Sequence, residues 1–262
     1  MATTSLQLQP ASGHGWLTGF VNMIDKEYGS WWRTRRALYH FIMWLLIING
    51  FLLLVGFDAG RQNPWAAVDD LIEVFFRVGG LFATIGVIVA TQNTVLAERE
   101  LGTAEWVLSK PVTREAFLLS KLLVNGLSFI GLAVLIPSVA FFLQTLFATY
   151  LQPDIDAFLL GAAFHIQQLL FYLALTMALG TFFNSRGAVS GMAIGLVFAG
   201  LILPNFFPWL WDYTPWQLPS LAYFAAVGRA LPDGTAPVVI LTGLYTLLLV
   251  LLAFWRFNRE EF

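Results

Sequence analysis

The sequence predicts an all-α integral membrane protein with six transmembrane helices. Of its 262 residues, 58% are hydrophobic and only 11% are charged, whereas a soluble domain carries roughly 25% charged residues. The apolar residues form long runs, each close to the length of about 20 residues that a helix needs to cross a bilayer. We therefore expect one transmembrane domain over residues 1–262, its length filled by membrane spans.

An amphipathic helix is predicted ahead of the first span. Residues 1–15 are small and polar, which favours a disordered tail. Between residues 16 and 36, apolar side chains recur at helical spacing, and Trp31 and Trp32 stand next to a run of arginines. This pattern is typical of a helix in the membrane interface, the alternative being a helix packed in the core. No Lys or Arg occurs in residues 1–25, so we expect no cleaved signal peptide.

The apolar runs predict the six spans. They cover residues 38–57, 78–96, 122–147, 158–183, 188–203 and 238–254. The charged residues 58–77 are expected outside, where the second helix begins before it enters the membrane. Residues 204–237 are too broken by proline for a span and too rich in tryptophan for a solvated loop. They predict an outer re-entrant segment of short helices before span six.

The distribution of basic residues predicts the orientation. With the N-terminus in the cytoplasm, eleven of the fourteen Lys and Arg residues lie on the inner side. The other three, on the outer side, are Arg61, Arg77 and Arg229. Because cytoplasmic loops carry an excess of positive charge, we expect a multi-pass protein of the cytoplasmic (inner) membrane with both termini in the cytoplasm.

One hydrophilic stretch, residues 98–121 between spans two and three, carries clear local signals. Gly102 can take the left-handed conformation that ends a helix descending from span two. Thr103 can cap the next helix, with Glu105 in its first turn. Pro111 stops that helix after about two turns. The pattern predicts a short helix that lies across the cytoplasmic surface of the membrane.

The same stretch predicts where span three begins and what the short helix contacts. Thr113 can cap a further helix, with Glu115 in its first turn, that runs into the membrane. The short helix carries Trp106, Val107 and Leu108, which are too apolar for a solvated loop. These side chains either dock on another protein or rest on the lipid interface, which tryptophan favours.

Residues 99–114 resemble the cytoplasmic loop of type-2 ABC transporter permeases of the exporter kind. The resemblance rests on the pattern Arg99-Glu100-x-Gly102-Thr103-x-Glu105-x-x-Leu108-Ser109-x-Pro111-Val112-Thr113-Arg114. In that family the loop holds a coupling helix, which docks into a groove on a separate ATPase subunit. The family also has a connecting helix that resembles residues 16–36 and a re-entrant element that resembles residues 204–237.

The resemblance implies which residues couple the chain to the ATPase. They are Glu98, Arg99, Glu100, Gly102, Thr103, Glu105, Trp106, Leu108, Lys110, Pro111 and Arg114. The first five would shape a hinge, the next four a docking face, and the last two the exit from the loop. The family often has leucine where Trp106 stands, so a wider groove is expected on the ATPase. The closest branch would be permeases linked to the maturation of copper enzymes.

The resemblance also implies partners. Two copies of the ATPase, which bind ATP and Mg²⁺, would dock under two copies of this permease or under this chain and a homologous one. The chain itself has no GxxxxGK[ST] phosphate loop and no metal-ligand spacing. We therefore expect no ATPase activity, cofactor or metal site in this chain. A net charge of −2 gives no reason to expect nucleic-acid binding.

Polar residues inside the predicted spans are further candidates, because polar groups are costly in a bilayer and are often functional there. They are Asn49, Asn125, His165, Gln167 and Gln168. These side chains either line a substrate path or form hydrogen bonds between helices.

Three classes of function stay open. The chain is a conduit for an exported substrate, or a mechanotransmission subunit that drives an extracytoplasmic partner and moves no substrate itself. The third class is an ATP-independent secondary transporter, which usually carries buried carboxylates that the predicted spans lack. The identity of a substrate is not readable from the residues.

Overall fold

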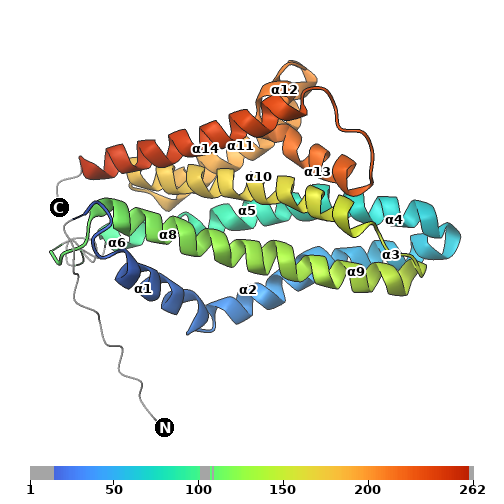
Figure 1. The fold of residues 1–262 in the computed structure, drawn as a ribbon, viewed down its shortest axis with the longest axis horizontal. Coiled ribbons are helices and arrows are strands. Elements are labelled where there is room, and N and C mark those ends of the chain that lie inside the picture. The colour runs from blue at the N-terminus through green and yellow to red at the C-terminus, as the bar shows by residue number, and fades with distance from the viewer. Residues whose placement is uncertain (1–14, 101–106, 108, 260–262) are drawn as a thin grey trace, which may run out of the picture.

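A computed structural model describes residues 15–100, 107 and 109–259, with the backbone alone for residues 57–62 and 100. Within these residues six helices are long and apolar enough to cross a membrane. They form an elongated bundle in which the spanning helices run roughly side by side (Figure 1). The predicted fold class, all-α with six spans, is confirmed. The tail predicted over residues 1–15 lies outside the described residues except for its last position.

The first spanning helix follows a separate N-terminal helix. Helix α1 (Phe20–Trp32) turns at residues 33–35 into α2 (Arg36–Trp44), which continues through a π-helical turn (Leu45–Asn49) into α3 (Gly50–Gln62). Helix α1 packs against α8 (Arg114–Phe129). It buries Met23, Glu27 and Trp31 on one face, while Val21 and Trp32 are exposed. Trp31 thus lies in the core, and the position of α1 in a membrane interface stays a prediction.

Residues 58–77 form the turn of a helical hairpin, and their position outside the membrane stays a prediction. Only Asn63 separates α3 from α4 (Pro64–Glu73), which continues through a π-helical turn (Val74–Gly79) into α5 (Gly80–Thr91) and, after a short break, α6 (Leu96–Glu100). The Asn63 side chain accepts a hydrogen bond from the Ala66 backbone N–H at 3.3 Å, and Pro64 occupies the first helical position. This cap starts the second helix 14 residues before the apolar run that begins at residue 78, in agreement with the expectation that the helix begins ahead of its span.

The remaining spanning helices match the predicted runs and extend beyond them by several residues. Helix α8 continues through a π-helical turn (Ile130–Leu135) into α9 (Ile136–Thr149). Then follow α10 (Ile155–Phe182), α11 (Arg186–Ile202) and α14 (Thr235–Asn258). The π-helical turn stands directly before Pro137, whose missing N–H and bulky ring disturb regular helical hydrogen bonding.

Residues 204–237 form the predicted short helices. They are a 3₁₀ turn (Leu203–Asn205), α12 (Leu210–Tyr213), a second 3₁₀ turn (Pro215–Gln217) and α13 (Leu218–Ala226). Helix α13 packs on α10 at close range, since a Cβ atom at Gly161 would lie 2.5 Å from the Ala222 carbonyl oxygen. The segment therefore covers one end of α10, and its re-entry into a membrane stays a prediction.

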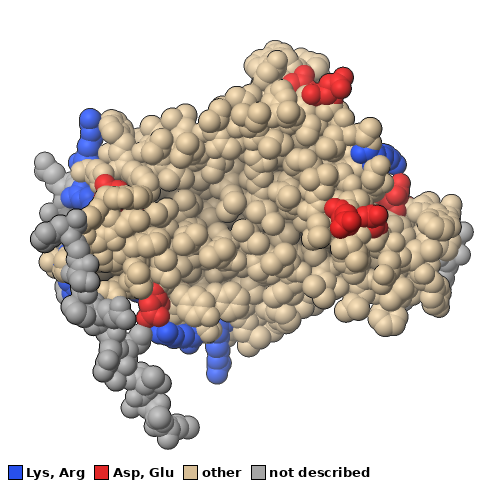
Figure 2. Space-filling model, viewed as in Figure 1, with Lys and Arg blue, Asp and Glu red and all other residues tan. Residues whose placement is uncertain are grey.

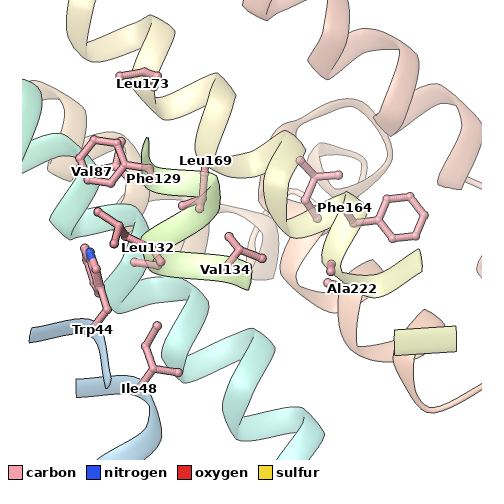
Figure 3. Close-up of a cluster of buried hydrophobic side chains, with 14 of the residues drawn as sticks. Trp44, Ile48, Val87, Phe129, Leu132, Val134, Phe164, Leu169, Leu173 and Ala222 are labelled. Carbon is pink, nitrogen blue, oxygen red and sulfur yellow. The ribbon is translucent and has the colours of Figure 1, made fainter. Parts of the chain in front are cut away.

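The core lies along α10, which packs against α5, α13 and α14. Trp44, Leu132 and Leu169, from three different spanning helices, gather in it (Figure 3). The Trp44 ring lies so close to α5 that a Cβ atom at Gly86 would come within 2.0 Å of it. In contrast, only 17% of the most apolar stretch of α14 is buried, which leaves the outer face of that helix to lipid or a partner.

Candidate coupling site

A cluster of four charged side chains lies at the end of the bundle where α1, α6 and α8 meet. Lys121 Nζ lies 2.7 Å from Glu27 Oε1 and 2.6 Å from Glu98 Oε1. Lys26 Nζ also lies 2.7 Å from Glu98 Oε1. We call Lys26, Glu27, Glu98 and Lys121 the ion-pair cluster. Since the Lys121 side chain is 2% exposed, the cluster places a charge in the core, and two carboxylates compensate it among the described residues.

Local capping sets the position of Lys121. Thr113 caps α8 as predicted, because its Oγ1 accepts a hydrogen bond from the Ala116 N–H at 3.2 Å and Glu115 lies in the first turn. The same hydroxyl donates to the Trp16 carbonyl oxygen at 2.6 Å. Gly19 is needed here, with φ of 80° and a hypothetical Cβ only 2.7 Å from Val112 Cγ2. The segment that leads into α1 is thus fastened to the start of α8.

Arg99 connects the loop to α10. Its Nη1 donates to the carbonyl oxygens of Gly180 and Phe183, both at 3.3 Å, and its Nη2 donates to Asn184 Oδ1 at 3.0 Å. Helix C-termini leave carbonyl groups without helical partners, and a cation there also complements the helix dipole. Arg99 therefore fixes α6 to the end of the fourth spanning helix.

Arg114 makes the equivalent connection to α14. Its Nη1 donates to the carbonyl oxygens of Phe257 at 2.7 Å and Asn258 at 2.9 Å. The neighbouring Glu115 accepts a hydrogen bond from Asn258 Nδ2 at 2.7 Å. The Phe117 and Phe257 rings stack with their centroids 5.4 Å apart. The start of α8 is thus fixed to the end of the sixth spanning helix.

Residues 98–121, which we call the coupling loop, therefore connect α1, α10 and α14 at one end of the bundle. In Figure 1 this end holds α6, the start of α8 and the C-terminus. Most of the Lys and Arg residues visible in Figure 2 also lie toward it. The predicted coupling residues Glu98, Arg99 and Arg114 thus lie at the same end of the bundle, each connected to a different helix.

Most of the middle of the coupling loop lies outside the described residues. Gly102, Thr103, Glu105, Trp106 and Leu108 lie outside the described residues, as does the side chain of Glu100. Around them, Val107 is buried, while Lys110 and Pro111 are exposed. The docking face assigned to this part of the loop stays a prediction.

Sequence reasoning missed three members of the ion-pair cluster: Lys26, Glu27 and Lys121. The distance in sequence explains this, since 94 residues separate Glu27 from Lys121. One signal was available. Glu27 stands between Met23 and Trp31 at four-residue spacing, so it lies on the apolar stripe of α1, and a carboxylate in that position requires a buried partner.

Asn125 belongs to this site rather than standing apart from it. Its Oδ1 accepts a hydrogen bond from Trp31 Nε1 at 3.0 Å, and its Nδ2 donates to the Lys121 carbonyl oxygen at 2.7 Å. It thus holds α1 against α8 one turn above the ion-pair cluster.

The other polar candidates connect spanning helices elsewhere. Asn49 Nδ2 donates to the Pro137 carbonyl oxygen at 3.0 Å and to Gln144 Oε1 at 3.1 Å. Gln167 Nε2 donates to the Val239 carbonyl oxygen at 2.7 Å, and Gln168 Nε2 to Thr84 Oγ1 at 3.0 Å.

His165 is buried one turn before Gln168, with its ring edge-on to Phe76. In the part of the chain that the structure describes, no group of three His, Cys, Asp or Glu residues could hold a metal ion.

Comparison with known proteins assigns the chain to a family. The family described as ABC-2 family transporter protein matches residues 53–262, which is most of the chain and includes the coupling loop. No curated protein matches it.

Proposed function

Because the chain belongs to the ABC-2 transporter family and is the membrane permease subunit of an ABC transporter, we propose that it couples ATP hydrolysis by a separate ATPase to substrate export. The ATPase subunit binds ATP and Mg²⁺, and this chain contributes no cofactor. The observation that carries the proposal is the ion-pair cluster, which joins the coupling loop to α1 and α8 through a buried lysine.

The mechanism follows from what the coupling loop holds. An ATPase docked on Trp106 and its neighbours would displace the loop when it closes on ATP. Glu98 would carry that displacement to Lys121 in α8, while Arg99 and Arg114 would carry it to the ends of α10 and α14. Because charged hydrogen bonds in a buried site resist separation, the helices would move with the loop instead of leaving it.

The assembly that this mechanism needs has two permease chains and two ATPases. The second permease is another copy of this chain or a homologue, and the exposed apolar faces of the first, fifth and sixth spanning helices offer surface for it. The coupling loop and both termini face the cytoplasm, with the protein in the inner membrane. This orientation is supported by the positive-inside distribution of the charges.

The second candidate function is mechanotransmission to an extracytoplasmic partner, without transport through the chain. It is favoured by the polar residues of the spanning helices, because Asn49, Gln167 and Gln168 all use their amide groups to connect helices. A seam between two permeases that stays closed in both nucleotide-free and ATP-trapped states would support this candidate over the conduit. Membership of the branch linked to copper-enzyme maturation stays a prediction, which the genes beside this one would test.

The proposal predicts that the purified chain does not hydrolyse ATP and that it co-purifies with a separate nucleotide-binding subunit. The measurement is ATP hydrolysis by the chain alone and after addition of the ATPase encoded beside it. Robust hydrolysis by the chain alone, with no second protein present, would sink the proposal.

A further inference from the structure

Each of the first three spanning helices contains a π-helical turn. The turns are Leu45–Asn49, Val74–Gly79 and Ile130–Leu135, and each has an α-helix before it and another after it. Helices α10, α11 and α14, which form the other spanning helices of the described chain, contain no such turn. Because π-helical turns are rare and are frequent at functional sites, three of them in consecutive spans call for a functional explanation.

The three turns lie at one level of the bundle. A Cβ atom at Gly79, in the second turn, would lie 3.1 Å from Ile48 Cγ2 in the first. Asn49 Nδ2, at the end of the first turn, donates to the carbonyl oxygen of Pro137, just beyond the third turn, at 3.0 Å. We call the three turns the π layer. The near halves of the helices, toward the coupling loop, are α2, α5 and α8, and the far halves are α3, α4 and α9 (Figure 1).

A pair of amide side chains connects two of these helices at the π layer. Gln144 Nε2 donates to the Asn49 carbonyl oxygen at 3.1 Å, and Asn49 Nδ2 donates to Gln144 Oε1 at 3.1 Å. Within a bilayer, a backbone group at an irregular turn needs a partner from a neighbouring helix, because water is absent there. The amide pair therefore stabilises an irregular backbone that would otherwise be costly.

A glycine stands in or next to each turn. They are Gly50, Gly79 and Gly131. Close packing does not require Gly50 or Gly131, since nothing lies within 4 Å of a Cβ atom built at either position. Glycine destabilises a helix interior relative to alanine, because its backbone has more conformational freedom. The π layer thus combines irregular hydrogen bonding with glycines that favour backbone bending.

Cavities on both sides of the π layer leave room for the helices to move. A cavity of about 300 Å³ lies between α3, α4 and α9, with Leu52 and Gln144 in its wall. A cavity of about 470 Å³ lies between α1, α2, the junction of α5 and α6, and α8, with Arg36 and Lys121 in its wall. Because protein interiors are usually packed closely, helices change their mutual angles most readily where such space exists.

We propose that the π layer is a hinge at which the near halves of the first three spanning helices bend relative to the far halves. The ion-pair cluster joins α1, α6 and α8, so the elements nearest the coupling loop move together. The far halves α3, α4 and α9 pack against one another and form the other body. This bending is a property of the fold, so the inference goes beyond the proposed function and does not depend on what drives it.

The test measures distances between pairs of spin labels in the full chain, purified in detergent without its ATPase. The near pair is Tyr39→Cys on α2 with Trp255→Cys on α14, and the far pair is Trp65→Cys on α4 with Ile240→Cys on α14. The four side chains are between 48% and 76% exposed, and the chain has no cysteine of its own. Helix α14 is the reference for both pairs because it contains no π-helical turn.

We expect a broader distance distribution for the near pair than for the far pair. Gly50→Ala and Gly131→Ala should each narrow the near distribution, because local opening becomes about fivefold rarer when alanine replaces glycine in a helix. Gly243→Ala is the matched control, since it also adds a Cβ atom to open space but lies in α14. It should leave both distributions unchanged.

Gln144→Leu tests the hinge in the opposite direction. It removes the side chain that bonds to the Asn49 carbonyl oxygen, so the near distribution should become broader. If this variant does not fold, the glycine variants carry the test, because their added methyl groups meet no neighbouring atom.

Two results would overturn the proposal. The first is an equal width of the near and far distributions in wild type, which would show that the π-helical turns are static. The second is the same near distribution in Gly50→Ala, Gly131→Ala and Gly243→Ala, which would show fraying of helix ends instead of bending at the π layer. Neither result involves ATP hydrolysis, so the hinge and the proposed function can fail separately.

Discussion

Lys121 is a single buried residue of α8 that connects this helix to both α1 and α6. Its side chain is 2% exposed and contacts one carboxylate from α1 and another from α6. Removing one member of a buried ion pair usually costs more than the pair contributes, because the remaining charges stay buried without compensation. Lys26 can compensate Glu98, but it lies 3.5 Å from Glu27 and is 43% exposed.

Lys121→Met should therefore destabilise the chain by about 3–5 kcal/mol, measured as a lower apparent melting temperature of the purified membrane subunit. Lys26→Met is the matched control and should cost about 1 kcal/mol or less, because the Lys26 side chain is 43% exposed and Lys121 still pairs with both carboxylates. Adding Glu27→Gln to Lys121→Met should restore part of the loss, since it removes a buried carboxylate that keeps only the longer, 3.5 Å contact with Lys26. Equal losses for the two single variants would contradict the assignment of Lys121 as the central buried charge.

At this scale the sequence allowed some of the site to be predicted. The Thr113 cap was readable because its signals, Pro111 before it and Glu115 after it, lie within a few residues. The pairing of Glu27 with Lys121 was not readable, because it depends on how α1 folds back against α8. The partners of Arg99 and Arg114 are mostly backbone carbonyl groups, which every residue carries, so the sequence does not identify them.

At the scale of the elements, hydropathy predicted the spanning helices, and the charges of residues 58–77 predicted that the second helix begins ahead of its apolar run. The first residue of that helix, Pro64, was not predicted. The decisive local signal was Asn63 followed by Pro64, a cap and a favoured first helical residue. A short hairpin between two helices needs only that signal, whatever the charge of the residues around it.

The packing of α2 on α5 gives a test of the arrangement of these elements. Gly86→Ala should destabilise the protein by about 1–3 kcal/mol through overpacking, because the added Cβ would lie 2.0 Å from the Trp44 ring. Gly243→Ala is the control, since nothing lies within 4 Å of its hypothetical Cβ. It should be neutral or stabilising by up to about 1 kcal/mol, because alanine favours helices. Comparable melting temperatures for the two variants would show that α2 does not pack on α5 in this way.

At the scale of the whole molecule, orientation is accessible because the chain contains no cysteine. Single cysteines at Ser109 and Asn258 should be protected from a membrane-impermeant thiol reagent in intact cells. A cysteine at the exposed Gln152 should be labelled. Permeabilised cells provide the control, in which all three positions become accessible. Labelling of Ser109 from outside would reverse the orientation and remove the coupling loop from the ATPase.

The central claim is that the coupling loop moves the spanning helices through Glu98. Glu98→Gln tests it with little damage, because the buried pair between Lys121 and Glu27 remains in place.

The measurement uses a spin label on Trp65→Cys, which is 76% exposed at the start of α4. In the complex with ATPase, the distance between the labels of the two permeases is recorded. Nucleotide-free and ATP-trapped states are compared. Wild type should show two different distance distributions. Glu98→Gln should still bind the ATPase and support ATP hydrolysis, but the difference between its two distributions should be smaller than in wild type, because the connections through Arg99 and Arg114 remain. A shift in Glu98→Gln as large as that of wild type would contradict the claim.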